Sequence, residues 1–317
     1  MRGALGTVLG VAALIGGATP VSAQEVLVVG TGDPRGLYVP AGYALAQIVG
    51  MTAPDVPPLV IEETGGSIEN LVRLRDGDFD FAVATSARAF QAVSGLPPFD
   101  ALTAIRDLEL VAALYAEPLT IVARAEVEAE TLQDLWGKRV NLGPAGSATR
   151  ELLDLLFDAQ GWLVDQAFVE ATEIPIAEQH IALCSGATDA IAYISAVPSS
   201  TVRHLAQACP VTFLAVEGEV AARMTADAPY LTETHLPAGA YPGLETDTPT
   251  IGAWALLVTL PGTEPAWTRG ILGALQAQAE LAADLHPVLA GFNPAAPLDP
   301  GGFLTPHAGS RALVTDQ

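Results

Sequence analysis

The sequence predicts an α/β protein with two lobes. Strand-like apolar runs alternate with helical patterns along most of the chain, which is typical of parallel βαβ units with helices on both faces of a sheet. The length of 317 residues suits two domains of ordinary size or one domain with two lobes. Two strand-like crossovers, near Pro118 and Pro249, are placed to join the lobes as a hinge.

The first part of the chain contains three strand-like runs, expected at residues 26–29, 59–62 and 79–84. A glycine-rich turn at 30–36 and a helical pattern at 38–49 follow the first run. A TGGS turn and a helix through Ile68, Leu71 and Leu74 follow the second. Asp76, Gly77 and Asp78 then stop that helix.

The later part alternates in the same way. A strand is expected at 119–123, a short helix at 131–136 with Thr131 and Asp134 near a capping pattern, and a strand at 140–142. A helix at 151–159 ends at Gly161, and another unit covers 176–183 and 190–194. Residues 227–249 are rich in proline and predict a long wrapping loop. A strand at 251–260, a long helix at 267–284 and a wrapping tail at 294–306 complete the chain.

Composition excludes several classes of partner. Hydrophobic residues make up 50% of the chain and charged residues 16%, which is enough for sizeable cores and argues against disorder. The net charge of −22 repels nucleic acid and anionic lipid. It also repels an anionic ligand, so an anion site must be built from local donors and a few arginines. Salt makes this workable, because it screens distant charges beyond about 10 Å.

The N-terminus has the pattern of an export signal. Arg2 precedes a short apolar run, and Val21, Ser22 and Ala23 resemble a cleavage site. The alternative is a membrane anchor, but the run is short and rich in glycine and alanine. We expect residues 1–23 to be removed and the mature chain to be soluble and periplasmic. Residues 24–118 with 248–317 would form the first lobe, and 119–247 the second.

The chain has two cysteines, Cys184 and Cys209, and export would place both in an oxidising compartment. A disulfide between them would close a loop of about 25 residues and stabilise the fold by about 3 kcal/mol. The alternative is two unpaired buried thiols. The cysteines lack metal-ligand spacing, so no metal site and no cofactor are expected.

Two glycine turns predict an anion site. One follows the strand at 140–142, where Gly143, Pro144 and Gly146 lead to Ser147 and Thr149 and then to a helix from Arg150. The other is the TGGSIEN segment at 64–70. Glycines expose backbone N–H groups, and a helix N-terminus favours an anion. Each turn alone could also be an ordinary strand-to-helix connection.

Other candidates were weighed in the same way. The segment GTGDPRG at 30–36 departs from the dinucleotide-binding spacing and is a small-ligand loop or a tight turn, with Thr31 and Tyr38 as polar contacts. Arg88 follows the third strand and could pair with a carboxylate, as could Arg150; both could equally be solvated helix residues. The sequence has no nucleophile elbow and no histidine pair with catalytic spacing, so an enzyme is not expected.

Five segments, taken together, resemble the TAXI family, the extracytoplasmic solute receptors of tripartite ATP-independent periplasmic (TRAP) transporters. The resemblance covers nearly all of the mature chain. The segments are GTGDPRGLYVPAGYALA, EETGGSIENLVRLRDGDFDFAV, LYAEPLTIVAR, LWGKRVNLGPAGSAT and ALCSGATDA.

The resemblance implies a type II periplasmic-binding-protein fold, with two α/β lobes, a two-strand hinge and a ligand cleft between the lobes. It implies that the solute is handed to a TRAP-type membrane permease. The cysteine pair matches one in some members. The implied ligand-binding residues are Thr31, Gly36, Tyr38, Gly66, Ser67, Asn70, Gly146, Ser147 and Thr149.

One departure from the family concerns the residues after the third strand. The family often has Gln-Ser-Asp there, whereas this chain has Thr85, Ser86, Ala87 and Arg88, which argues against amino-acid binding. We keep Ser86 and Arg88 as candidates, with Tyr38 or Tyr115 covering the apolar body of the ligand. The expected ligand is a small organic anion, namely a dicarboxylate or a 2-oxo acid such as 2-oxoglutarate, with glutamate second. We expect a monomer; a secreted enzyme on the same scaffold and a ligand sensor are the alternatives.

Overall fold

The structure is a computed structural model that describes residues 25–34, 36–144, 147–168, 170–292 and 301–315. The segment expected to be cleaved, residues 1–23, lies outside the described residues. Within the described ranges, no helix combines the length and the apolar character that a membrane span requires.

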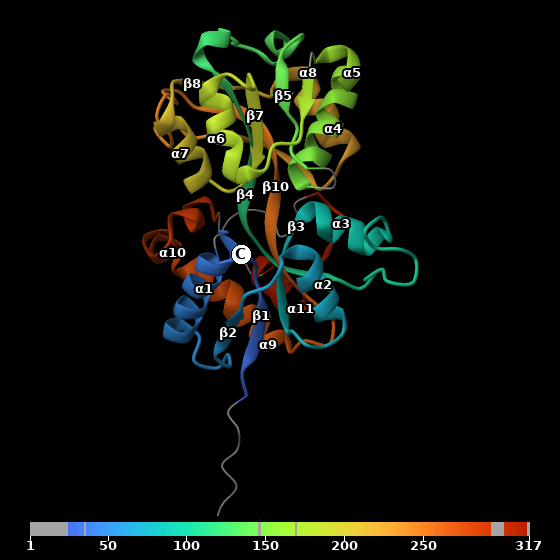
Figure 1. Cartoon of the computed structure of the whole chain (residues 1–317). Coiled ribbons are helices and arrows are strands. Elements are labelled where there is room, and N and C mark those ends of the chain that lie inside the picture. Colours follow the sequence, from blue (N-terminus) through green and yellow to red (C-terminus); the bar gives the residue numbers. More distant parts are fainter. Residues whose placement is uncertain (1–24, 35, 145–146, 169, 293–300, 316–317) are drawn as a thin grey trace, which may run out of the picture.

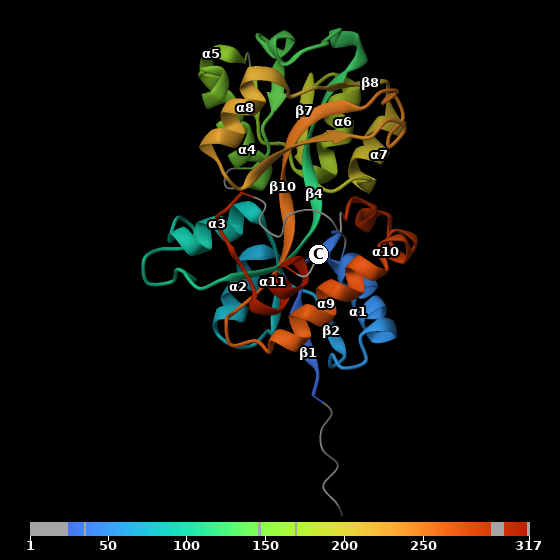
Figure 2. The ribbon, with the colours of Figure 1, turned by 180° about the vertical axis from the view of Figure 1, so that it is seen from behind.

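Two α/β lobes lie one above the other, and two long strands run from one lobe to the other (Figure 1). These strands are β4 (Glu109–Arg124) and β10 (Thr248–Thr259). Figure 2 shows the same pair of strands connecting the lobes from behind. This architecture confirms the predicted fold class, an α/β protein with two lobes on a two-strand hinge.

The first lobe is built on β1 (Leu27–Gly30), which pairs in parallel with β2 (Leu59–Glu62) and β3 (Phe81–Thr85). A helix follows each strand: α1 (Tyr38–Thr52), α2 (Ser67–Arg75) and α3 (Ser86–Ser94). The C-terminal elements return to this lobe: α9 (Pro265–Ala277), α10 (Ala279–Leu285), η3 (Pro287–Gly291), β11 (Thr305–Pro306) and α11 (Ala308–Thr315). Its apolar cores form because α1 and α9 bury one face of the sheet, including Val29, Phe81 and Leu257.

The second lobe repeats the layered plan. Its sheet contains β5 (Arg139–Asn141), β6 (Glu170–Thr172), β7 (Ala190–Ile194) and β8 (Val211–Leu214). Its helices are η1 (Ala125–Val127), η2 (Leu132–Leu135), α4 (Ala148–Gln160), α5 (Val164–Ala167), α6 (Ile176–Ser185), α7 (Ser200–Ala208) and α8 (Gly218–Asp227). Strand β9 (Leu231–Leu236) precedes β10. Strand β5 is parallel to both β6 and β7, as the alternating pattern predicts.

Strand pairing changes midway along each crossing strand. Residues 109–118 of β4 pair with β10, and residues 119–124 pair with β7 and β8. Strand β10 pairs with β9 up to Ala253 and with β3 from Ala255. The two strands therefore cross between the lobes side by side, and Pro118 of β4 is the register partner of Gly252 of β10. The assignment of residues 24–118 and 248–317 to the first lobe and of residues 119–247 to the second stays a prediction.

Three expected elements differ in the structure. The loop expected at 227–249 contains β9, in which Leu231 and Leu236 at the two ends are buried and Glu233 and His235 are exposed. Its prolines flank this strand and do not interrupt it. The single helix expected at 267–284 is divided at Gln278 into α9 and α10. The strand expected at 119–123 is the end of the much longer β4.

The cysteine pair forms a disulfide. Cys184 in α6 is bonded to Cys209 at the end of α7, with an S–S distance of 2.06 Å and a Cα–Cα distance of 5.6 Å. The expected pairing is therefore confirmed, and the alternative of two free thiols is wrong. The bond ties together the two helices on one face of the second lobe, one of which begins at the cavity described below.

Candidate functional site

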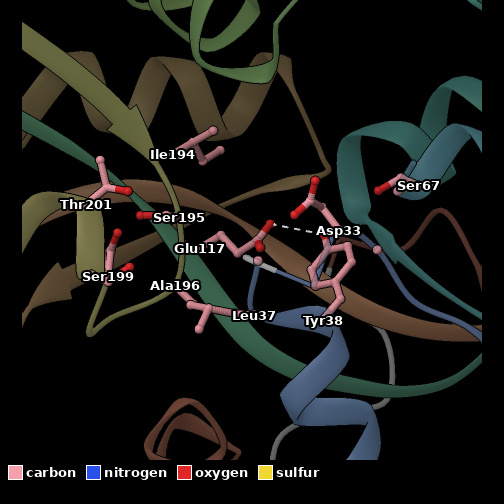
Figure 3. A pocket seen from close by; sticks show the side chains of 14 residues that line it. Asp33, Leu37, Tyr38, Ser67, Glu117, Ile194, Ser195, Ala196, Ser199 and Thr201 are labelled. Atoms are coloured by element: carbon pink, nitrogen blue, oxygen red, sulfur yellow. Dashed lines mark hydrogen bonds between the residues drawn. The ribbon is translucent and has the colours of Figure 1, made fainter. Parts of the chain in front are cut away.

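A cavity of about 360 Å³ lies between the lobes. The first lobe lines it with the loop after β1, with the start of α2 and with Glu117 of β4. The second lobe lines it with the segment from Ile194 to Thr201. Figure 3 shows Glu117 between these two groups, with Tyr38 and Ser67 on one side and Ser195, Ser199 and Thr201 on the other. Both lobes therefore contribute to one site.

Three helices begin at this cavity. Residues from the first turns of α1, α2 and α7 line it, and none of the three helices has a side-chain cap at its N-terminus. The first N–H groups of a helix have no partner within the helix, and this end carries partial positive charge. Three such ends around one cavity favour an anion there, and the described lining includes no lysine or arginine.

The strand–helix order explains why these helices meet. Helices α1, α2 and α7 each follow a strand of a parallel sheet, β1, β2 and β7, and the carboxyl ends of parallel strands are where such folds place ligands. The turn before α2 needs a glycine, because Gly66 has a φ of 104°. The Ser67 hydroxyl then accepts a hydrogen bond from the Thr85 N–H at 3.1 Å, which holds α2 against the next strand.

Glu117 is the acidic group at the centre of the cavity. The Tyr38 hydroxyl donates a hydrogen bond to its Oε2 at 3.4 Å (Figure 3). Burial raises the pKa of Glu117 to about 7, although the hydrogen bond from Tyr38 lowers it in part. Burial and the nearby Glu117 also raise the pKa of the Tyr38 hydroxyl well above its usual value, so that this tyrosine stays a donor.

Four of the predicted ligand-binding residues line the cavity: Gly36, Tyr38, Gly66 and Ser67. Two others lie buried behind the lining and support it. The Thr31 hydroxyl donates to the Glu62 carbonyl at 2.7 Å. The Asn70 amide donates to the carbonyls of Thr31 and Val83, which ties α2 to β1 and β3.

Tyr115 and Ser86 are buried residues that are absent from the described lining. Tyr115 is 1% exposed and packs in the core of the first lobe. The Ser86 hydroxyl accepts a hydrogen bond from the Trp254 N–H at 2.9 Å and donates to the Tyr230 carbonyl at 2.7 Å. Ser86 therefore connects α3 to the segment that enters β9 and to the crossing strand β10.

Arg88 lies outside the described lining of the larger cavity. Its guanidinium contacts the Glu151 carboxylate across the two lobes at 3.0 Å and the Gln91 side chain at 2.7 Å. It lines a second hollow of about 40 Å³ between α3 and α4. Arg88 belongs to α3 and Glu151 to α4. The Glu151 carboxylate lies nearer to the Arg88 guanidinium than the larger cavity does, and this opposite charge determines where the guanidinium lies.

We expect Arg88→Ala to change the affinity for a bound anion by less than about fivefold, or about 1 kcal/mol, because Glu151 and Gln91 hold its guanidinium outside the described lining of the larger cavity. Isothermal titration calorimetry with 2-oxoglutarate measures this change, and Arg150→Ala is the matched control. A loss of affinity much larger than this in Arg88→Ala alone would place the anion beside Arg88, in the smaller hollow.

The described residues of the second predicted glycine turn are absent from the described lining of the cavity. Gly146 lies outside the described residues, and Ser147, Thr149 and Arg150 are absent from the described lining. The Ser147 hydroxyl accepts from the Arg150 N–H at 3.2 Å and so caps α4 itself. The Thr149 hydroxyl accepts from the Ile194 N–H at 3.3 Å. The Arg150 guanidinium pairs with Asp154 and Glu173.

Sequence reasoning missed the second-lobe half of the lining. It consists of residues 194–201, and the described part of the chain gives the buried Ser195 hydroxyl no hydrogen-bond partner. A signal was present, because the segment SAVPSST directly follows the strand predicted at 190–194. Glu117 was missed as well, although it precedes the predicted crossover at Pro118. Asp33 also lines the cavity.

The described residues hold no group of three or more histidines, cysteines or carboxylates that could bind a metal ion. The two lobes, the two crossing strands and the cavity between them define the class of fold, which is the two-lobed fold of periplasmic solute-binding proteins. A model of the NMT1-like family matches residues 29–310. The chain therefore belongs to the NMT1-like family.

Several solved structures share this fold. A TctC solute-binding protein from Polaromonas is 18% identical with a TM-score of 0.57, over 87% of this chain and 91% of that one. The periplasmic aliphatic sulphonate-binding protein SsuA from Escherichia coli is 16% identical with a TM-score of 0.54, over 86% and 85%. MatC from Rhodopseudomonas palustris, solved with bound malate, is 17% identical with a TM-score of 0.53, over 94% and 97%. The first two of these similar proteins are named as binding proteins.

Proposed function

We propose that this protein is an extracytoplasmic receptor that captures a small organic anion between its lobes and delivers it to a TRAP-type membrane permease. The candidate ligands are a dicarboxylate, a 2-oxo acid such as 2-oxoglutarate, and glutamate. The observation that carries the proposal is the meeting of three helix N-termini at one interlobe cavity. MatC supports it, because that protein of the same fold was solved with malate.

In this proposal the N–H groups at the start of α1, α2 and α7 bind the carboxylate oxygens of the ligand. Because α1 and α2 belong to one lobe and α7 to the other, one anion that contacts all three favours the closed arrangement over the open one. Closure about the two crossing strands would then create the surface that the permease recognises. The predicted TAXI membership, the export signal and the monomeric state belong to this proposal.

Titration calorimetry of the purified protein tests the ligand class. The panel contains succinate, malate, 2-oxoglutarate, glutamate, a neutral sugar and a diamine. Binding of one or more of the carboxylates supports the proposal, whereas binding of only the sugar or the diamine would contradict it.

A transport measurement tests the permease. Deleting the gene should abolish uptake of the ligand that depends on an ion gradient and persists after ATP depletion. Uptake that stops with ATP depletion would instead indicate an ATP-driven importer.

A further inference from the structure

We propose that Glu117 determines specificity in the cavity by binding the captured anion as a neutral carboxylic acid, so that the protein takes up the solute together with one proton. This inference rests on the proposed function and extends it to the protonation state of the complex. An anion site usually excludes an acidic side chain, and the inference gives Glu117 a role in one.

The position of Glu117 requires an explanation in an anion site. It is half-buried on β4, in a cavity where three helix N-termini meet and whose described lining has no lysine or arginine. Its Oε2 accepts the hydrogen bond from Tyr38. An ionised Glu117 would repel a bound carboxylate, whereas a protonated one donates a hydrogen bond to it.

The groups around Glu117 decide which form it takes. Glu117 faces Tyr38 of α1 and lies near Tyr115 of its own strand. The loop after β1 adds the exposed carboxylate of Asp33 to the same cavity. From the second lobe the described lining presents serine and threonine hydroxyls and apolar side chains, without an ionisable group. None of these described groups carries a positive charge that would favour ionisation.

The pKa of Glu117 gives the expected pH dependence its sign. In the free protein this pKa is raised to about 7 by burial. A bound carboxylate raises it further, because like charges disfavour ionisation. Below pH 7 the side chain is already protonated and the affinity is constant. Above pH 7 binding must take up a proton, and the affinity falls by up to about tenfold for each pH unit.

Calorimetry from pH 7 to pH 9 with 2-oxoglutarate tests the inference. Both carboxyl groups of this probe are ionised throughout the range. His180 and His204 contact each other beside Thr201, and neither belongs to the described lining of the cavity. For the unchanged protein we expect a fall in affinity of about tenfold or more across the range, with proton uptake visible as a heat that depends on the buffer.

Glu117→Gln is the decisive variant, because the amide keeps an N–H donor at the same place and cannot titrate. Its affinity should be independent of pH from 7 to 9 and should exceed that of the unchanged protein at pH 9. Tyr38→Phe is the matched control. It removes the hydroxyl that favours the ionised form, so its fall in affinity should move to higher pH. Melting curves of both variants confirm that they are folded.

The outcomes separate this inference from the proposed function. If no carboxylate binds at any pH, the proposed function fails. If 2-oxoglutarate binds but the affinity of the unchanged protein is constant or rises from pH 7 to pH 9, the inference about Glu117 is wrong and the proposed function stands. A fall that persists unchanged in Glu117→Gln would also overturn the inference.

Discussion

Ser200→Pro is expected to weaken the binding of 2-oxoglutarate about 10- to 100-fold while leaving the fold intact. Ser200 is the first residue of α7 and lines the cavity. Its backbone N–H lies in the first turn, where the helix itself supplies no acceptor. Removing one hydrogen bond to a charged group costs about 1.5–3 kcal/mol, which corresponds to this change in affinity.

Proline suits this position for conformational reasons. It is tolerated at the first position of a helix, where its missing N–H breaks no helical hydrogen bond. The preceding residue, Ser199, has φ −92° and ψ 130°, the extended conformation that precedes proline without a clash. The variant therefore removes one backbone donor and little else.

Ser200→Ala is the matched control, since it removes the hydroxyl and keeps the N–H. Calorimetry should show a large loss of affinity for the proline variant and a small one for the alanine variant, with similar melting temperatures. Affinities that equal that of the unchanged protein in both variants would exclude the start of α7 from the binding site. Equal losses would assign the contact to the hydroxyl group.

Asp189→Ala is expected to lower the free energy of unfolding by about 1.5–3 kcal/mol, the range for hydrogen bonds to a charged group, because its two arginine partners are partly exposed. The Asp189 side chain is 10% exposed and binds two arginines: its Oδ1 lies 2.7 Å from Arg139 and 3.0 Å from Arg124. Its Oδ2 accepts the Arg139 N–H at 3.0 Å. The carboxylate therefore connects β4 to β5 at the start of β7, and its loss leaves two guanidinium groups without this partner.

The same contacts predict acid sensitivity. Burial raises the pKa of Asp189, but the hydrogen bonds from Arg139 and Arg124 lower it more, so the folded pKa lies well below the ordinary 3.8. A depressed pKa stabilises the fold above pH 3.8, and this contribution is lost as the pH falls below that value. The difference in stability between the unchanged protein and Asp189→Ala should therefore shrink below about pH 4.

Urea unfolding at pH 7 and at pH 3.5 measures both effects. Glu219→Ala is the control, because Glu219 is 90% exposed and its pair with Arg223 is worth less than about 1 kcal/mol. A loss in Asp189→Ala no larger than that of the control would show that the Asp189 cluster contributes little to stability.

Local features of the structure could be predicted from neighbouring residues. The pattern at Thr131 and Asp134 forms a capping box at η2, and Gly161 ends α4 in the left-handed conformation with φ 71°. Each depends on a few residues that are close in the sequence, so propensity and turn chemistry are sufficient. Strand β9 was missed because its stability comes from pairing with β10 and not from its own composition.

The same distinction between local and distant contacts applies to the residues of the candidate site. Gly66 and Ser67 were identified because a glycine turn before a helix has a sequence signal, and both line the cavity. Arg88 and Arg150 have equally suggestive positions, but their charges are taken up by Glu151, Asp154 and Glu173. Which acidic group lies nearest to an arginine depends on how helices pack, and an acidic chain offers many partners.

By itself, the sequence determined the alternation of strands and helices, the two-lobed class, the cysteine pair and the turn before α2, because each follows from periodicity, composition or local geometry. Tertiary structure alone decided that α7 supplies the opposite wall and that Glu117 lies at the centre of the cavity. The physical reason is that a cleft between lobes brings together segments distant in the chain. Its charge balance therefore depends on three-dimensional neighbours that spacing along the sequence does not encode.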